Sequence, residues 1–295
     1  MSSEDQSTGG DVDFGFDYYR YDPSMGAALL FVILFGISSA LHLFQLVRHR
    51  TWYFIPFMLG GVFEALGYVG RIISSGETPE WTMGPYILQT VMILVAAAMM
   101  AASIYMILGR LTRLLEADHH SVIPVKWTSK IFVTTDVISI IMQAAGGAML
   151  AIADTPDQFK TGENIIIGGL FVQLVAFGIF IVVAGIFYRR VLRDPTPASQ
   201  TVDVPWQRYM WVVFAGSSLI LIRSVFRVIE YLQGNAGYLM SHEVFLYLFD
   251  GVLMIVVMVL FNVYHPSRII NKRTTMKAAG WDSAMDSSEV ELRTV

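Results

Sequence analysis

The sequence predicts an all-α integral membrane protein built as a bundle of seven transmembrane helices. Three observations carry this prediction. The composition is 55% hydrophobic and only 15% charged, the mean hydropathy is +0.55, and seven long apolar stretches recur along the 295 residues. A soluble domain carries charge on about a quarter of its residues, so this chain needs a solvent other than water. The apolar–polar alternation of membrane strands is absent, which argues against a β-barrel.

Each apolar stretch is long enough to cross the hydrocarbon core, which takes about 20 residues as a helix. The spans are expected at 25–47, 54–74, 84–109, 130–152, 165–188, 209–232 and 242–264. Short connections with helix-breaking residues such as Pro79 and Pro195 join them. Three regions follow: an acidic tail over 1–24, a seven-helix domain over 25–265, and a polar tail over 266–295 that we expect to be disordered.

The distribution of basic residues predicts the orientation, because the cytosolic loops of membrane proteins are enriched in Lys and Arg. One set of connections, together with the C-terminal tail, holds 15 basic residues, whereas the other set holds only Arg20 and Lys160. With seven spans, this places the N-terminus outside the cytosol and the C-terminus inside it. The first 24 residues lack a basic start and an apolar stretch, so we do not expect them to be a signal peptide.

Ionisable residues inside the spans are the main functional signal, because a charge at mid-bilayer costs at least about 2.5–3.5 kcal/mol. Within three of the spans they recur three, four or seven residues apart, so each of these helices presents one polar stripe. We expect the stripes to share a partly hydrated interior in the outer half of the bundle, with Asp136 as the exception toward the cytosolic side. The candidate substrate-binding residues are Glu64, Tyr68, Arg71, Gln89, Asp136, Gln143, Gln173, Arg223, Arg227, Glu230 and Asp250.

Two interpretations of these charges remain open. They can form ion pairs that only hold the bundle together, or they can line a path for an amphipathic ligand. Glu243 is a weaker candidate, because it fits the membrane interface. Glycine pairs such as Gly60-Gly61 and Gly146-Gly147 predict close packing of helices, and the 16 methionines are expected to fill apolar gaps.

Several classes of function are disfavoured. A net charge of −4 gives no basis for a nucleic-acid partner. The chain has no cysteine and its six histidines are scattered, so neither a metal site nor another cofactor is expected. No Gly-x-x-x-x-Gly-Lys-Ser/Thr motif occurs, so the chain does not hydrolyse a nucleotide by that route. No pair of nucleophile and base can be recognised, so an intramembrane enzyme is not expected.

A series of motifs follows in order along about residues 25–270. They include Glu64-Ala-Leu-Gly67-Tyr68-Val-Gly-Arg71, Ala102-Ser-Ile-Tyr105, Asp136-Val-Ile-Ser139, Gly168-Gly169-Leu-Phe-Val-Gln173, Arg223-x-x-x-Arg227-x-x-Glu230 and His265-Pro266. In these motifs the chain resembles the fungal lipid-translocating exporters. That family comprises membrane proteins named for resistance to aminocholesterol, exporters of sphingoid long-chain bases and a protoporphyrin transporter. The third span departs from the family pattern, which has a proline near the position of Ala97.

The resemblance implies a fungal protein of the plasma membrane that moves or exports amphipathic lipids, such as sphingoid long-chain bases or sterol-like compounds. Its partners would be an amphipathic lipid ligand and the surrounding membrane lipids. A seven-helix receptor or lipid sensor is the alternative, since resistance can also arise through signalling. The short cytosolic connections disfavour a large signalling partner.

Overall fold

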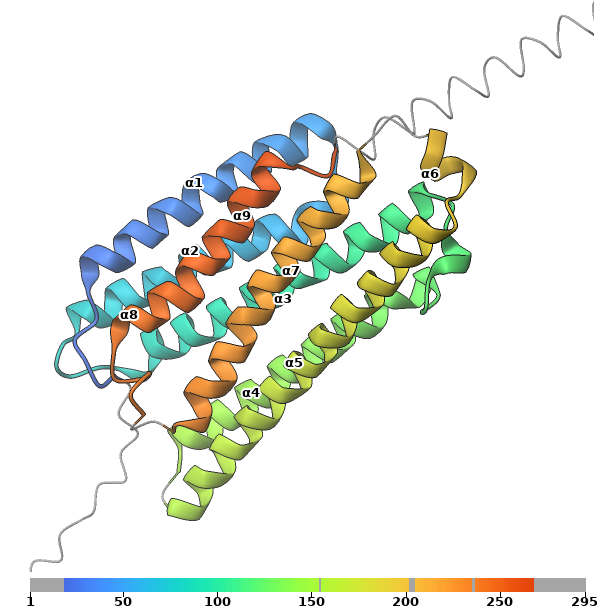
Figure 1. Ribbon diagram of the computed structural model, residues 1–295. Helices are drawn as coiled ribbons and strands as arrows, with labels where there is room; N and C mark the ends of the chain where they lie inside the picture. The colour runs from blue at the N-terminus through green and yellow to red at the C-terminus, as the bar shows by residue number, and fades with distance from the viewer. Residues whose placement is uncertain (1–18, 154, 202–204, 235–236, 268–295) are drawn as a thin grey trace, which may run out of the picture.

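The part of the chain that the structure describes contains seven helical segments of membrane-spanning length, as the sequence predicts (Figure 1). The computed structural model describes residues 19–153, 155–201, 205–234 and 237–267. Most of the expected acidic tail over 1–24 and of the expected disordered tail over 266–295 lies outside these residues.

The seventh span differs from the other six, because it is assembled from three consecutive pieces. The first six spans are α1 (Met25–His49), α2 (Ile55–Gly76), α3 (Met83–Leu114), α4 (Val125–Ala151), α5 (Pro156–Arg193) and α7 (Trp206–Leu232). The seventh consists of α8 (Glu243–Leu246), a π-helical turn η3 (Tyr247–Val252) and α9 (Leu253–Val263). The connections hold three short helices, η1 (Trp52–Phe54), η2 (Asp118–His120) and α6 (Pro197–Thr201).

Helix α5 is much longer than the span expected at 165–188. Its 38 residues extend over about 57 Å at 1.5 Å per residue, against a hydrocarbon core of about 30 Å. Polar flanks continue the helix at both ends: the Thr155 side chain caps its start, and Arg190 and Arg193 lie in its last turn. The apolar stretch therefore marks only the part of the helix that must cross lipid.

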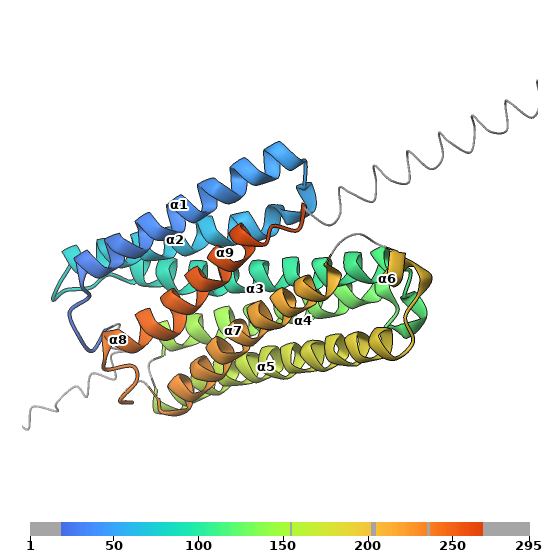
Figure 2. The same ribbon diagram turned by 45° about the horizontal axis from the view of Figure 1, so that its top comes forward.

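The spans form a ring in the order α1, α2, α3, α4, α5, α7 and α8–α9, which closes where α9 packs on α1 (Figures 1 and 2). Helix α3 also contacts α7 across the ring and is the most buried span. Successive spans alternate in direction. We call the end of the bundle where α1, α3 and α5 begin the Tyr19 end, and the opposite end the His120 end. By the distribution of basic residues, the Tyr19 end is expected to face outward.

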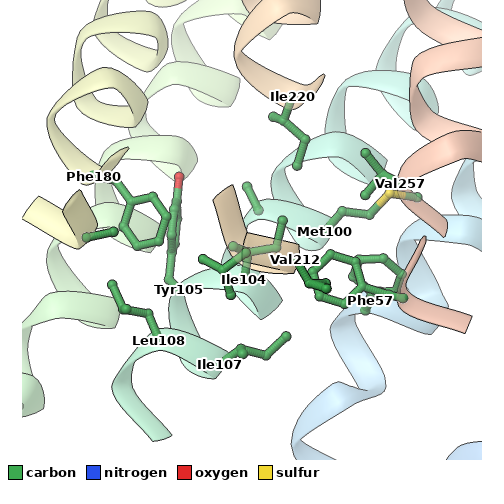
Figure 3. Close-up of a cluster of buried hydrophobic side chains, with 14 of the residues drawn as sticks. Phe57, Met100, Ile104, Tyr105, Ile107, Leu108, Phe180, Val212, Ile220 and Val257 are labelled. Carbon is green, nitrogen blue, oxygen red and sulfur yellow. The ribbon is translucent and has the colours of Figure 1, made fainter. Parts of the chain in front are cut away.

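A core of apolar side chains fills the middle of the bundle and its half toward the His120 end (Figure 3). It includes Phe57 of α2, Met100 and Ile104 of α3, Phe180 of α5 and Val257 of α9, all of them fully buried. Large apolar side chains on the outer faces of the helices are exposed, as the surface of a lipid-embedded bundle requires. Most of the charged side chains within the spans lie in the half toward the Tyr19 end.

Candidate functional site

Four of the candidate residues form one buried network in the half toward the Tyr19 end. Nε of Arg223 lies 2.6 Å from Oδ1 of Asp250, and Nε of Arg227 lies 3.2 Å from Oδ2 of the same carboxylate. Nη1 of Arg227 donates to Oε2 of Glu230 at 2.8 Å. All four side chains are buried. The network joins α7 to η3 and holds two positive and two negative charges, so its formal charge is zero.

The backbone around Asp250 is unusual. This residue lies in η3, where the helix widens into a π-helical turn, and such turns are rare and frequently occur at functional sites. The next residue, Gly251, lets α2 come close: a Cβ there would lie 2.6 Å from Oη of Tyr68. The sequence gives no signal for the π-turn, because its residues continue an apolar helical pattern.

Glu64 and Tyr68 lie one helical turn apart on α2, beside this network. Glu64 is fully buried, and none of the described residues donates a hydrogen bond to either of its carboxylate oxygens. The charges that act on it most strongly are those of Arg223, Asp250 and Arg227. The Tyr68 ring stacks on Phe31 of α1, with centroids 5.0 Å apart, and its hydroxyl also lacks a hydrogen-bond partner within the described chain.

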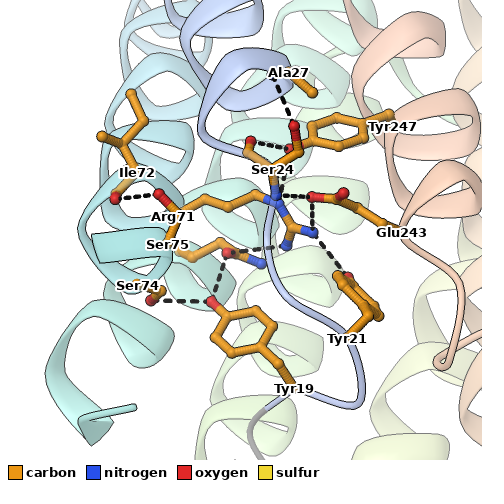
Figure 4. A network of polar contacts seen from close by, with 11 residues as sticks. Tyr19, Tyr21, Ser24, Ala27, Arg71, Ile72, Ser74, Ser75, Glu243 and Tyr247 are labelled. Atoms are coloured by element: carbon orange, nitrogen blue, oxygen red, sulfur yellow. Dashed lines mark hydrogen bonds and ion pairs between the residues drawn. The ribbon is translucent and has the colours of Figure 1, made fainter. Parts of the chain in front are cut away.

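A second cluster surrounds Arg71 at the Tyr19 end (Figure 4). Nη2 of Arg71 lies 2.8 Å from Oε1 of Glu243 and donates to the Tyr21 hydroxyl at 2.9 Å. Nε donates to the Tyr247 hydroxyl at 3.0 Å, and Nη1 donates to Oε1 of Gln89 at 3.4 Å. The guanidinium also lies over the rings of Tyr21 and Tyr247, within 5.3 Å of each centroid, where the electron-rich faces attract it.

The segment that precedes α1 packs across this end of the bundle. The Tyr19 hydroxyl donates to Oε1 of Gln89 at 2.8 Å, and Glu243 accepts from the backbone N–H of Ser24 at 2.7 Å. Burial raises the pKa of the Tyr19 and Tyr21 hydroxyls, so both stay neutral. Sequence reasoning missed the two tyrosines and underrated Glu243. The available signal was the cluster of aromatic residues directly before the first span.

The remaining candidates on α4 and α5 take no part in the Arg223–Asp250 network. The amide of Gln143 donates to Ser139 at 2.7 Å and to Gln173 at 3.3 Å, and Ser139 donates to the Gly169 carbonyl at 2.6 Å. These bonds join α4 to α5. Asp136 accepts from the Tyr105 hydroxyl at 3.1 Å, one turn nearer to the His120 end. The structure therefore does not bring Asp136 or Gln173 to the Arg223–Asp250 network.

An apolar cavity of about 230 Å³ lies between α3, α4, α5 and α7 in the half toward the Tyr19 end. Its walls are mainly aliphatic and aromatic, with Thr90, Gln143 and Arg227 as the polar exceptions. They consist of Met83, Tyr86, Ile87, Thr90, Val91, Leu94, Gln143, Ala144, Gly147, Ala148, Leu150, Ile166, Leu170, Arg227 and Tyr231. We call this space the apolar cavity.

A smaller space of about 60 Å³, the polar cavity, adjoins it. Its walls include Arg71, Gln89 and Glu230, together with Tyr19 and Tyr21 of the segment before α1. The two cavities share four wall residues, which are Tyr86, Thr90, Arg227 and Tyr231. A polar compartment and an apolar one thus lie side by side across the Arg227 side chain.

The apolar cavity reaches the side of the bundle between α3 and α4. Ile87 of α3 and Ala144 and Ala148 of α4 line it and are exposed. Two small side chains on α4 leave this side of the cavity open. A lipid could therefore reach the cavity from within the membrane.

One group of side chains in the described part of the chain has the spacing of metal ligands. His119, His120 and Asp194 place ligand atoms within 4.8 Å of one another at the His120 end. Nε2 of His120 already lies 3.0 Å from the backbone carbonyl of Asp194, and the Asp194 carboxylate is exposed. This contact joins η2 to the end of α5 and explains the cluster without a metal.

Comparison with known proteins gives a consistent set of relatives. The family model described as "RTA1 like protein" matches residues 57–273. Protein RTA1 of Saccharomyces cerevisiae is 35% identical over 277 residues, which cover 85% of this chain and 86% of that protein. Protoporphyrin uptake protein 1 of the same yeast is 36% identical over 287 residues, covering 85% and 93%.

A third relative is more distant. The sphingoid long-chain base transporter RSB1 of Saccharomyces cerevisiae is 25% identical over 288 residues, which cover 86% of this chain and 74% of that protein. No solved structure matches the chain.

Proposed function

The chain belongs to the RTA1-like family, and on this basis we propose that it is a transporter that moves amphipathic lipids across the membrane in which it lies. Two relatives are named for movement of such molecules, one for protoporphyrin uptake and one for transport of sphingoid long-chain bases. The proposal includes the plasma membrane as the location, with the Tyr19 end outward. None of these three relatives is named as an enzyme.

The pairing of the two cavities is the observation that supports this function best. An amphipathic lipid has a polar head and an apolar body, and a site for it needs both environments in contact. The apolar cavity offers space for a chain or a ring system. The polar cavity offers Arg71, Glu230 and Gln89 to a head group.

The opening between α3 and α4 supports entry from the bilayer. A lipid that enters there keeps its body in an apolar environment throughout, whereas entry from water would expose it. Each buried CH₂ is worth about 0.8 kcal/mol, so a long chain strongly favours the lateral route. The chain has no nucleotide-binding motif of the P-loop type, so movement would be downhill or driven by an ion gradient.

Reconstitution tests the proposal. Purified protein in liposomes should speed the passage of a fluorescent long-chain amine between leaflets, measured as loss of fluorescence to a membrane-impermeant quencher. Ala148→Phe fills the apolar cavity and should reduce the rate to that of protein-free liposomes. Ala145→Phe is the matched control: Ala145 lies on the same helix, is exposed and does not line the cavity.

Equal rates with and without protein would overturn the proposal. If the protein binds the amine and Ala148→Phe abolishes binding, yet no movement occurs, the family resemblance would instead fit a lipid sensor. If Ala145→Phe impairs movement as much as Ala148→Phe, the apolar cavity is not the path.

A further inference from the structure

Glu64 is the one carboxylate beside the Arg223–Asp250 network that the network leaves without a partner. Arg223 and Arg227 direct their guanidiniums to Asp250 and Glu230 instead, at 2.6 to 3.2 Å. Both oxygens of Glu64 are buried and receive no hydrogen bond from the described chain. This is the reverse of the usual situation, in which buried charges are paired.

The elements packed around Glu64 offer it no other charge. On its own helix the titratable neighbour is Tyr68. Helices α1, α3 and α9 contact the neighbouring turns of α2 through side chains that carry no charge. They are Phe35, Ser39, Ile93, Met100 and Met258. The charges that face Glu64 are therefore Arg223 and Arg227 of α7 and Asp250 of η3.

Counting charges fixes the state of Glu64. The two arginines and the two carboxylates of the network already balance. An ionised Glu64 would add one uncompensated negative charge in a site without water contact, and a buried group in that position takes up a proton instead. The observed arrangement, with no donor directed at Glu64, fits a neutral carboxylic acid.

We propose that Glu64 is a proton-binding site and that the protein exchanges this proton for the cationic head group of an amphiphile. This inference rests on the proposed transport function and adds its energy source and the charge of its substrate. The polar cavity brings the substrate to the network, because Glu230 and Arg227 both line it.

The exchange conserves charge at each step. An alkylammonium that binds the Glu230 carboxylate adds one positive charge to the buried set and breaks the ion pair between Arg227 and Glu230. Arg227 then pairs with Asp250 alone. Arg223 leaves Asp250 and moves toward Glu64. Glu64 is fully buried and does not line the polar cavity, whereas Arg227 does, so water reaches Glu64 from that cavity only after Arg227 has left Glu230. Glu64 gives its proton to this water, its carboxylate pairs with Arg223, and the buried set is neutral again. One cation thus enters for each proton that leaves.

The test uses liposomes that contain the full-length protein and an entrapped pH-sensitive dye. The probe is a dodecyltrimethylammonium ion at a concentration far below micelle formation. This amphiphile carries no titratable proton, so any pH change comes from the protein. Its entry should raise the pH inside the liposomes. Glu64→Gln, which imitates the protonated form, should abolish the pH change, whereas Asp136→Asn, a buried carboxylate away from the network, should retain it.

The outcomes separate the two proposals. If wild-type protein moves the amphiphile without a pH change, or if Glu64→Gln retains the pH change, the proton site is overturned while transport stands. If nothing moves, transport fails, and infrared spectroscopy still decides the state of Glu64. The wild-type spectrum should contain a carboxylic-acid C=O band that Glu64→Gln lacks. Absence of that band would refute the proton site.

A stability measurement guards against misfolding of the variant. Because glutamine has the shape of a protonated glutamate, Glu64→Gln should unfold at the same temperature as the wild type or higher. A large loss of stability would show that Glu64 is ionised and held by a partner, which would also overturn the proposal.

Discussion

Nε of Arg223 lies 2.6 Å from Oδ1 of Asp250, and this contact joins α7 to the π-helical turn η3 inside the bundle. Both side chains are fully buried or nearly so. The same carboxylate also holds Arg227 through its second oxygen. Asp250 is thus the shared partner of two arginines, and the seventh span is fixed to α7 through it.

Asp250→Asn should therefore destabilise the protein severely. The substitution removes the carboxylate that two buried guanidiniums share, and removal of one partner from a buried pair costs about 3–5 kcal/mol. The measurement is the thermal unfolding of the purified protein in detergent, followed by tryptophan fluorescence. Glu80→Gln, in the exposed connection before α3, serves as the control and should unfold like the wild type. Similar unfolding of the two variants would show that the ion pair contributes nothing.

The neighbouring glycines Gly146 and Gly147 on α4 should differ sharply in their tolerance of alanine. A Cβ on Gly146 would lie 2.7 Å from the carbonyl oxygen of Gly162 on α5, whereas a Cβ on Gly147 would meet no atom within 4 Å. Gly146→Ala must push two helix backbones apart, and overpacking of this kind costs about 1–3 kcal/mol. Gly147→Ala should be neutral or stabilising, since alanine is the better helix former.

Unfolding of the two glycine variants in parallel checks this prediction. Both add the same methyl group to the same turn, so differences in helix propensity cancel in the comparison. A Gly146→Ala protein as stable as Gly147→Ala would mean that α4 and α5 do not approach as closely as the structure shows.

The fold could be predicted because lipid imposes a simple rule. A segment that crosses the hydrocarbon core must be apolar and about 20 residues long, so each of the seven spans shows directly in the sequence. The rule does not predict how far a helix continues beyond the hydrocarbon core. Helix α5 therefore begins at Pro156, well before the predicted residue 165, because a Thr155 cap and polar side chains suffice there.

The site could be predicted only in part. Helical spacing places Arg223, Arg227 and Glu230 on one face of α7, and the structure has them there. Spacing along one helix does not determine which partner on another helix each charge takes. That Asp250 pairs with both arginines, and that Glu64 pairs with neither, follows from how the π-turn packs on α7.

The partners outside the spans were harder to foresee. Tyr19 and Tyr21 reach Arg71 and Gln89 from an irregular segment, which has no periodicity to analyse. Asp136 is an opposite case: its sequence position suggests a functional charge, but its observed contact is the Tyr105 hydroxyl. One oxygen of this carboxylate thus accepts from a neutral donor on an adjacent helix, while Oδ1 has no hydrogen-bond partner among the described residues.

The orientation of the bundle is the remaining prediction, and the composition makes it simple to test. The chain contains no cysteine, so one introduced cysteine is the only thiol available to a membrane-impermeant maleimide. Glu80 at the Tyr19 end and His119 at the His120 end are both exposed. Glu80→Cys should be labelled in intact cells, and His119→Cys only after the membrane is permeabilised.

The physical reason is the excess of Lys and Arg in the connections at the His120 end, since such residues remain on the cytosolic side. Equal labelling of both variants after permeabilisation is the control for thiol reactivity. The reverse pattern in intact cells would place the polar cavity at the cytosolic surface. The head group of an amphiphile would then be taken from the inner leaflet, and Glu64 would exchange its proton with the cytosol instead of the exterior.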